Sequence, residues 1–154
     1  GFDLPNTFIV GAEGALVGLT LKHTPSDLYR ALMEGICYEM RVNIEALGAS
    51  GIPITALHAT GGCAKSELWL QMKADILNVP ITRMSTDEAG TVGGIMLTGV
   101  ATGAYRDLGE AQRALVRPLK RYEPREAMHS AYSEHYERYK RLYHAMRPLL
   151  EDRQ

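Results

Sequence analysis

Residues 58–77, HATGGCAKSELWLQMKADIL, place a pair of glycines at the point where a strand-like run gives way to a helix-like one. Gly61 and Gly62 suit a tight turn with positive φ, a helix amino terminus with free N–H groups, and a backbone open to close contact. A nucleotide is a ligand that uses all three properties. Strand-to-helix turns also contain glycine for geometry alone, so the pair by itself leaves both interpretations open.

Strand-like and helix-like patterns alternate on both sides of this turn. The apolar run over residues 54–60 predicts a strand, and the periodic pattern over residues 64–78 predicts a helix. The apolar side chains on one face of that helix are Leu68, Met72 and Ile76. Two further short strands are expected over residues 15–21 and 79–83. This alternation indicates an α/β fold built in layers.

The first long helix is predicted to begin at Ser26, a good N-cap residue that follows Pro25. Apolar side chains recur along this helix at helical spacing and mark its expected buried face: Leu28, Leu32, Ile36, Met40 and Leu47. Gly48 and Gly51 are expected to end it, because glycine readily adopts the left-handed conformation found at helix carboxyl ends.

The second half of the chain is predicted to be mostly helical. Residues 87–105 form a small-residue helix, residues 107–116 a shorter one, and residues 118–124 break the pattern with a proline at each end. A long helix is expected over residues 125–152. Its tyrosine stripe, which we expect to dock on its own domain, consists of Tyr132, Tyr136, Tyr139 and Tyr143.

The composition predicts a single domain with its own core. The chain has 154 residues, of which 45% are hydrophobic and 23% charged, and its formal net charge is −1. This balance argues against nucleic acid or a membrane as a partner. Cys37 and Cys63 lack the spacing of a metal site or redox pair, and no apolar run of about 18 residues could span a bilayer. We therefore expect a cytoplasmic location.

Common short motifs do not explain the glycine pair. Its spacing matches neither the phosphate loop nor the dinucleotide fingerprint. An oxidoreductase nucleotide domain is disfavoured because no acidic residue stands at a strand end about twenty positions later. The histidines show no metal-ligand spacing with a third ligand nearby, and His58, inside a predicted strand, is expected to be a satisfied core residue. No metal site is predicted in this chain.

Three stretches carry a more specific signal. Residues 14–35, GALVGLTLKHTPSDLYRALMEG, combine a glycine-flanked apolar strand with a following helix. TGGCAKSELWLQMKADIL, residues 60–77, holds the glycine turn, and DEAGTVGGIMLTGVATGAY, residues 87–105, is the small-residue helix. In this order they resemble the carboxy-terminal domain of the FGGY carbohydrate kinases, the family of xylulose, glycerol and related sugar kinases.

The resemblance implies a fold and a place in a larger enzyme. The fold would be the actin-like, ribonuclease H-like ATPase domain, an α/β fold with a mixed central sheet flanked by helices. Residues 1–154 would form the carboxy-terminal nucleotide-binding domain, using ATP and Mg²⁺ within the full-length enzyme. The catalytic base and sugar pocket would lie in an absent amino-terminal domain, so this fragment alone is expected to be inactive. The start at Gly1 rather than Met fits such a piece.

Carried over residue by residue, the resemblance places the adenine and ribose of ATP against Gly61, Gly62 and Cys63. Ser66 would add a side-chain contact at the start of the helix. Lys65 matches the Ala-Lys-Ser form of the family, and it is expected either to contact the nucleotide or to be a solvated helix residue.

The small-residue helix supplies the other candidate positions. The resemblance implies that Gly90 to Gly94 form a second wall of the nucleotide cleft, although such glycines also serve close helix packing. Asp87 and Glu88 are interpreted as acids that stabilise a helix amino terminus rather than as catalytic groups. Trp69, beside the apolar face of its helix, is expected to pack in the core rather than to stack on adenine.

The leading hypothesis is the ATP-binding domain of a sugar or polyol kinase that transfers the γ-phosphate of ATP to a carbohydrate hydroxyl. The alternative is a non-catalytic regulatory or interaction module of the same fold without nucleotide affinity. Thr60, Cys63 and Glu13 motivate it, because each departs from the usual residue of the family. Expected partners are ATP or ADP, a sugar or polyol held by the missing domain, and a second copy of the chain in a homodimer.

Overall fold

The computed structural model describes residues 15–151, with only the backbone described at residues 143, 147 and 149–151. The described residues form helices and a small sheet, as the alternating pattern predicted. In chain order the elements are α1 Pro25–Ala49, β1 Leu57–Ala59, the 3₁₀ helix η1 Gly62–Lys65, α2 Glu67–Leu77, β2 Ile81–Met84, α3 Ala89–Ala101, α4 Leu108–Leu115, β3 Pro118–Tyr122 and α5 Glu126–Glu151.

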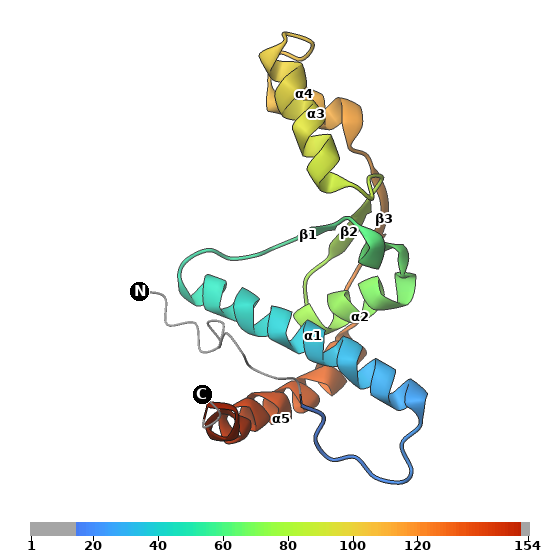
Figure 1. Cartoon of the computed structure of the whole chain (residues 1–154), viewed down its shortest axis with the longest axis vertical. Coiled ribbons are helices and arrows are strands. Elements are labelled where there is room, and N and C mark those ends of the chain that lie inside the picture. Colours follow the sequence, from blue (N-terminus) through green and yellow to red (C-terminus); the bar gives the residue numbers. More distant parts are fainter. Residues whose placement is uncertain (1–14, 152–154) are drawn as a thin grey trace.

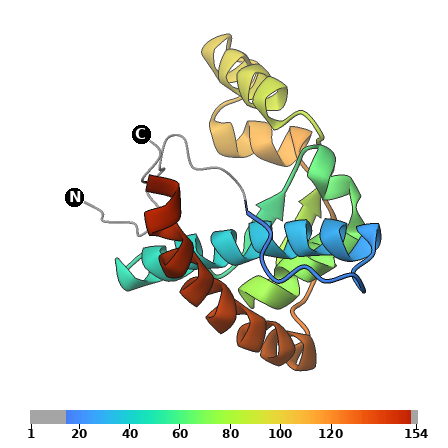
Figure 2. The ribbon, with the colours of Figure 1, turned by 60° about the horizontal axis from the view of Figure 1, so that its bottom comes forward.

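The sheet is mixed, as predicted. Its order is β1-β2-β3, with β1 parallel to β2 and β3 antiparallel to β2. The strands lie between a layer formed by α1, α2 and α5 and an arm formed by α3 and α4, which projects away from that layer (Figure 1). A second view shows α5 running beneath α1 and α2 (Figure 2).

The prediction of a strand over residues 15–21 is wrong. This segment has no regular secondary structure, and its apolar side chains, Leu16, Val17, Leu19 and Leu21, are all exposed. An apolar run becomes a strand only where a neighbouring strand accepts its backbone hydrogen bonds. Within residues 15–151 no strand pairs with this segment.

The segment 118–124, expected to break the pattern, contains strand β3. Pro118 tolerates this position because it is the first residue of a strand at the sheet edge, where its missing N–H costs little. The ladder is irregular at the same end, between Arg83 and Met84 of β2. The pairing of Ile81 with Tyr122 at the other end places two buried side chains opposite each other.

Helix α1 begins earlier than predicted. Thr24 is the N-cap rather than Ser26, and it forms a capping box with Asp27. The Thr24 backbone N–H donates to the Asp27 carboxylate at 2.8 Å, and Pro25 occupies the first helical position. The helix passes through Gly48 and ends at Ala49, with Gly51 at a φ of 83° just beyond it.

The buried face of α1 also differs from the prediction. Met33, Cys37 and Tyr38 are buried, whereas Leu32, Ile36 and Leu47 of the expected face are exposed. Because α2 and α5 pack on the face that contains Met33 and Cys37, these neighbours decide which residues enter the core. Burial raises the pKa of the Cys37 thiol to about 11, so this cysteine stays protonated at neutral pH.

Helix α2 is the most buried element of the core. Met72 and Ile76 are buried as predicted. The prediction that Leu68 is buried is wrong, because this residue lies at the exposed first turn of the helix. Trp69 packs against the core, as expected. His58 was expected in the core and is exposed, because it lies on β1 facing away from the helical layer.

Helix α5 carries the predicted tyrosine stripe. Tyr132 and Tyr136 are buried and Tyr139 packs against the core, which confirms docking on its own domain. Tyr143 belongs to the residues whose side chains are not described. The Tyr136 hydroxyl donates to the Glu45 carboxylate of α1 at 2.8 Å, which joins the two long helices.

Candidate functional site

The glycine turn lies between β1 and α2, and its two glycines have different roles. Gly61 has a φ of 84° and a ψ of −178°, a conformation essentially restricted to glycine. Gly62 has no positive φ, and a Cβ added there would meet nothing within 4 Å. Backbone geometry therefore requires glycine at Gly61, whereas Gly62 leaves open space beside the exposed start of η1.

Ser66 joins the turn to α2. It is the N-cap of α2, and its hydroxyl accepts a hydrogen bond from the Trp69 N–H at 3.3 Å. The side chain is exposed and its own O–H proton remains available to a ligand. Cys63 is also exposed and is a free thiol.

Lys65 ties the turn to the segment that leads into α3. Its ammonium lies 3.0 Å from the Asp87 carboxylate, and both side chains are exposed. A pair of this kind contributes little stability. Gly61 lies against the same segment, because a Cβ built there would be 4.0 Å from the Asp87 carbonyl oxygen. Lys65 is therefore neither a free solvated cation nor buried in the domain.

The first turn of α3 follows this contact directly. Gly90 is exposed, and neither Gly90 nor Gly94 would bring an added Cβ within 4 Å of another atom. Asp87 thus contacts the glycine turn and lies two residues before α3, and both Gly62 and Gly90 present backbone without a side chain. Glu88 is the N-cap residue of α3 and makes no side-chain capping bond.

One residue near this region escaped the sequence analysis. Arg83 of β2 pairs in register with Ala59 of β1, two residues before Gly61. Its Nε is buried and makes no hydrogen bond to any described residue. A single arginine within a short apolar strand was the only signal in the sequence, and it did not distinguish this residue from an exposed strand cation.

The described residues contain no group of three or more His, Cys, Asp or Glu side chains that could hold a metal ion. Over the same residues, no helix has the length and apolar character needed to cross a bilayer.

Comparison with known proteins identifies the family. Residues 8–102 match the family model of the carboxy-terminal domain of the FGGY carbohydrate kinases. The chain belongs to the FGGY family of carbohydrate kinases. The match covers α1, the glycine turn and all of α3, so it includes the first two stretches that carried the resemblance and the third as far as residue 102.

Relatives within the FGGY family are sugar and polyol kinases. A xylulose kinase from Staphylococcus epidermidis is 30% identical over 140 residues, which is 91% of this chain and 28% of that protein. A glycerol kinase from Paenarthrobacter aurescens is 38% identical over 114 residues, covering 73% of this chain and 22% of that protein. The chain thus spans less than a third of these relatives.

The fold also matches solved FGGY kinases. The ligand-bound xylulose kinase from Lactobacillus acidophilus superposes with a TM-score of 0.81 at 29% identity. The superposition covers 94% of this chain and 29% of that one. The mixed sheet with its helices is therefore an arrangement that occurs within a full-length FGGY kinase.

Proposed function

We propose that residues 1–154 are the carboxy-terminal nucleotide-binding domain of a sugar or polyol kinase that uses ATP. The family membership supports carbohydrate phosphorylation. The limited coverage of the relatives supports a further domain that carries the sugar pocket and the catalytic base. We also propose a cytoplasmic location for the enzyme, with ATP, a sugar or polyol, and a second copy of the chain as partners.

One observation carries the assignment of the site. Gly62, in the turn that Asp87 contacts, and Gly90, in the helix that follows Asp87, present exposed backbone without a side chain, and a flat ring can make close contact with such surfaces. Adenine and ribose would lie against Gly61, Gly62 and Cys63, with the Ser66 hydroxyl as a polar contact. Lys65, already beside Asp87, would border the site.

This chain would contribute binding and orientation rather than proton transfer. Phosphoryl transfer needs a base for the attacking hydroxyl and an in-line arrangement of that hydroxyl and the γ-phosphate. Mg²⁺, when bound with the nucleotide in the full-length enzyme, would neutralise phosphate charge. Closure of the missing domain over this one would exclude water from the reacting groups.

The proposal is tested by two-dimensional NMR titration of this chain with ADP. We expect saturable shifts for residues 61–66 and for Gly90 at millimolar ADP. Gly62→Val should abolish them, because its side chain fills the open space. The matched control is Gly35→Val, at a helical position of α1 where an added Cβ also meets nothing within 4 Å.

Two results would contradict the proposal. If a folded wild-type chain shows no shifts at ADP concentrations well into the millimolar range, the non-binding module replaces the kinase domain. If Gly35→Val weakens binding as much as Gly62→Val does, the glycine turn is not the site.

A further inference from the structure

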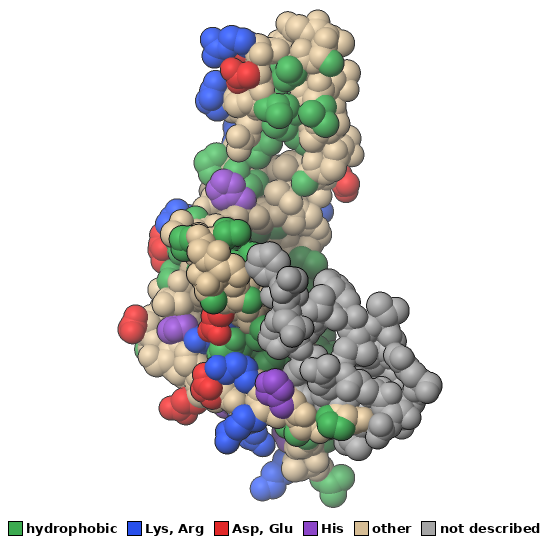
Figure 3. All heavy atoms as spheres, turned by 90° about the vertical axis from the view of Figure 1, so that its left-hand side faces the viewer, with side chains coloured by type: hydrophobic (Ala, Val, Ile, Leu, Met, Phe, Trp, Pro, Cys, Tyr) green, Lys and Arg blue, Asp and Glu red, His purple; other side chains and the backbone are tan. Residues whose placement is uncertain are grey.

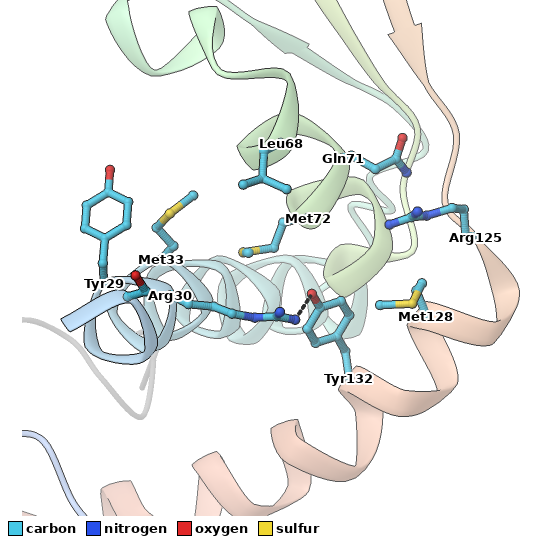
Figure 4. Close-up of a pocket in the computed structure, with 10 residues that line it drawn as sticks. Tyr29, Arg30, Met33, Leu68, Gln71, Met72, Arg125, Met128 and Tyr132 are labelled. Atoms are coloured by element: carbon cyan, nitrogen blue, oxygen red, sulfur yellow. Dashed lines mark hydrogen bonds between the residues drawn. The ribbon is translucent and has the colours of Figure 1, made fainter. Parts of the chain in front are cut away.

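A cavity opens between α1, α2 and α5, on the opposite side of α2 from the strands (Figure 4). Its volume is about 360 Å³, within the range of sites for small molecules. Three methionine side chains, Met33, Met72 and Met128, form much of its wall, one from each helix. Neither the glycine turn nor the start of α3 contributes to it.

Two arginines border the cavity, and its lining includes no carboxylate. Arg30 donates from Nε to Glu34 at 2.7 Å and from Nη2 to the Tyr132 hydroxyl at 3.3 Å. A guanidinium has five N–H groups, so these two bonds leave others that can reach a ligand. Tyr132 accepts the bond from Arg30 and keeps its own O–H proton as a donor.

Arg125 stands at the other side of the cavity and is anchored by Asp75. Its Nη2 lies 2.6 Å from the Asp75 carboxylate, which is completely buried. Glu34 and Asp75 thus already offset much of the charge of the two arginines. A ligand carboxylate would therefore be held by the remaining N–H groups of Arg30 and by the Tyr132 hydroxyl rather than by net positive charge, and the two nearby carboxylates would repel a phosphate dianion more strongly than a monocarboxylate.

The methionine wall indicates the body of the ligand. Thioether sulfurs are polarisable and contact aromatic rings favourably, and methionine adapts its shape to an irregular occupant. Leu68 extends the apolar surface to the mouth of the cavity, where its side chain is 70% exposed. This exposed leucine was predicted to be buried, and an apolar occupant would cover it.

We propose that this cavity binds a small aromatic monocarboxylate, with its ring on the three methionines and its carboxylate on Arg30 and Tyr132. The site is separate from the proposed nucleotide site and does not rest on the proposed function. Helix α2 links the two, since Ser66 of the glycine turn caps its amino terminus and α2 carries Leu68 and Met72 into the cavity.

The test uses the chain with ¹³C-labelled methionine methyl groups and benzoate as the probe. We expect saturable shifts at Met33, Met72 and Met128, with the methyl groups of Met40, Met84, Met96 and Met146 as internal references. Benzamide, which has the same shape without the charge, and acetate, which has the charge without the ring, should each bind at least about tenfold more weakly.

Arg30→Gln should weaken benzoate binding by about tenfold, the loss expected for a charge-assisted hydrogen bond. The matched control is Arg41→Gln. Arg41 lies on the same helix, pairs with Glu45 four residues later and reaches Ser133 of α5, but does not line the cavity. This control should bind benzoate as the wild type does.

A second variant keeps the test decisive if Arg30→Gln fails to fold. Leu68→Asp places a negative charge at the exposed mouth without touching the core, and it should abolish benzoate binding. The proposal is overturned if benzoate causes no saturable shift, if benzamide binds equally well, or if all seven methyl groups respond alike. It is also overturned if both Leu68→Asp and a folded Arg30→Gln bind as the wild type does.

Discussion

At the scale of single residues, neighbouring positions of similar type differ sharply in what the fold requires of them. Gly61 is held in a conformation that other residues rarely adopt, whereas Gly62 is not. Cys37 is buried and Cys63 is exposed. In both pairs the sequence shows two identical residues, and the backbone or the packing around each one gives it a separate role.

The two glycines make a matched pair for a stability measurement. Gly61→Ala should lower the free energy of unfolding by about 2 kcal/mol, because its φ and ψ lie in a region essentially closed to side chains. Gly62→Ala should change it by no more than about 0.5 kcal/mol, since the added methyl group meets open space. Urea denaturation followed by circular dichroism measures both, and equal losses would refute the distinction.

At the scale of elements, the attachment of α2 to α5 depends on one buried carboxylate. Asp75 of α2 accepts from the Arg125 guanidinium and from the Arg125 backbone N–H at 2.9 Å. Gln71 donates to the same carboxylate at 3.0 Å, and the His129 ring lies 2.9 Å from the Asp75 carbonyl oxygen. A buried charge is tolerated only with partners of this kind, so these contacts fix how the two helices meet.

Asp75→Asn tests this attachment. The substitution keeps the shape and removes the charge, so the free energy of unfolding should fall by about 2 kcal/mol, as for a lost charged hydrogen bond. The comparison variant is Glu123→Gln, which breaks an exposed ion pair with Arg121 and should cost less than about 1 kcal/mol. Thermal unfolding of both variants is the measurement, and an equal effect would mean that burial of Asp75 is unimportant.

At the scale of the whole molecule, the chain is divided between a packed layer and an arm. The core cluster draws on α1, α2, α5 and the strands, while α3 has no buried residue and packs on α4. Hydrophobic side chains are visible on the surface of this arm (Figure 3), and Ile95 and Leu97 are 50% and 63% exposed. Few buried contacts imply low local stability for the arm.

Hydrogen exchange should reveal this division. Amides in the middle of α3 are expected to exchange at least about tenfold faster than those in the middle of α2, because the arm opens without disrupting the core. Mass spectrometry of the exchanging chain measures both segments in one sample. Equal protection of the two helices would show that arm and core unfold as one unit.

The features of the fold that could be predicted are those encoded by local patterns in the sequence. The alternation of strand and helix and the tyrosine stripe of α5 follow from periodicity, which depends only on spacing along the chain, whereas the mixed sheet was implied by the family resemblance. The family followed from three ordered motifs, and the match over residues 8–102 confirmed it. The roles of the candidate site residues remain predictions, although the fold brings Gly61 and Lys65 against Asp87, two residues before α3.

By itself, therefore, the sequence determined the family, the presence of the five α-helices and the position of the glycine turn. Only the tertiary structure decided which face of α1 is buried, that residues 15–21 do not pair as a strand, and that Asp75 anchors α5. The residue type shows whether a side chain is apolar or charged, and the spacing shows which neighbours share its helix face. Whether that face meets protein or water depends on segments far away in the chain, whose contacts form only when the chain folds.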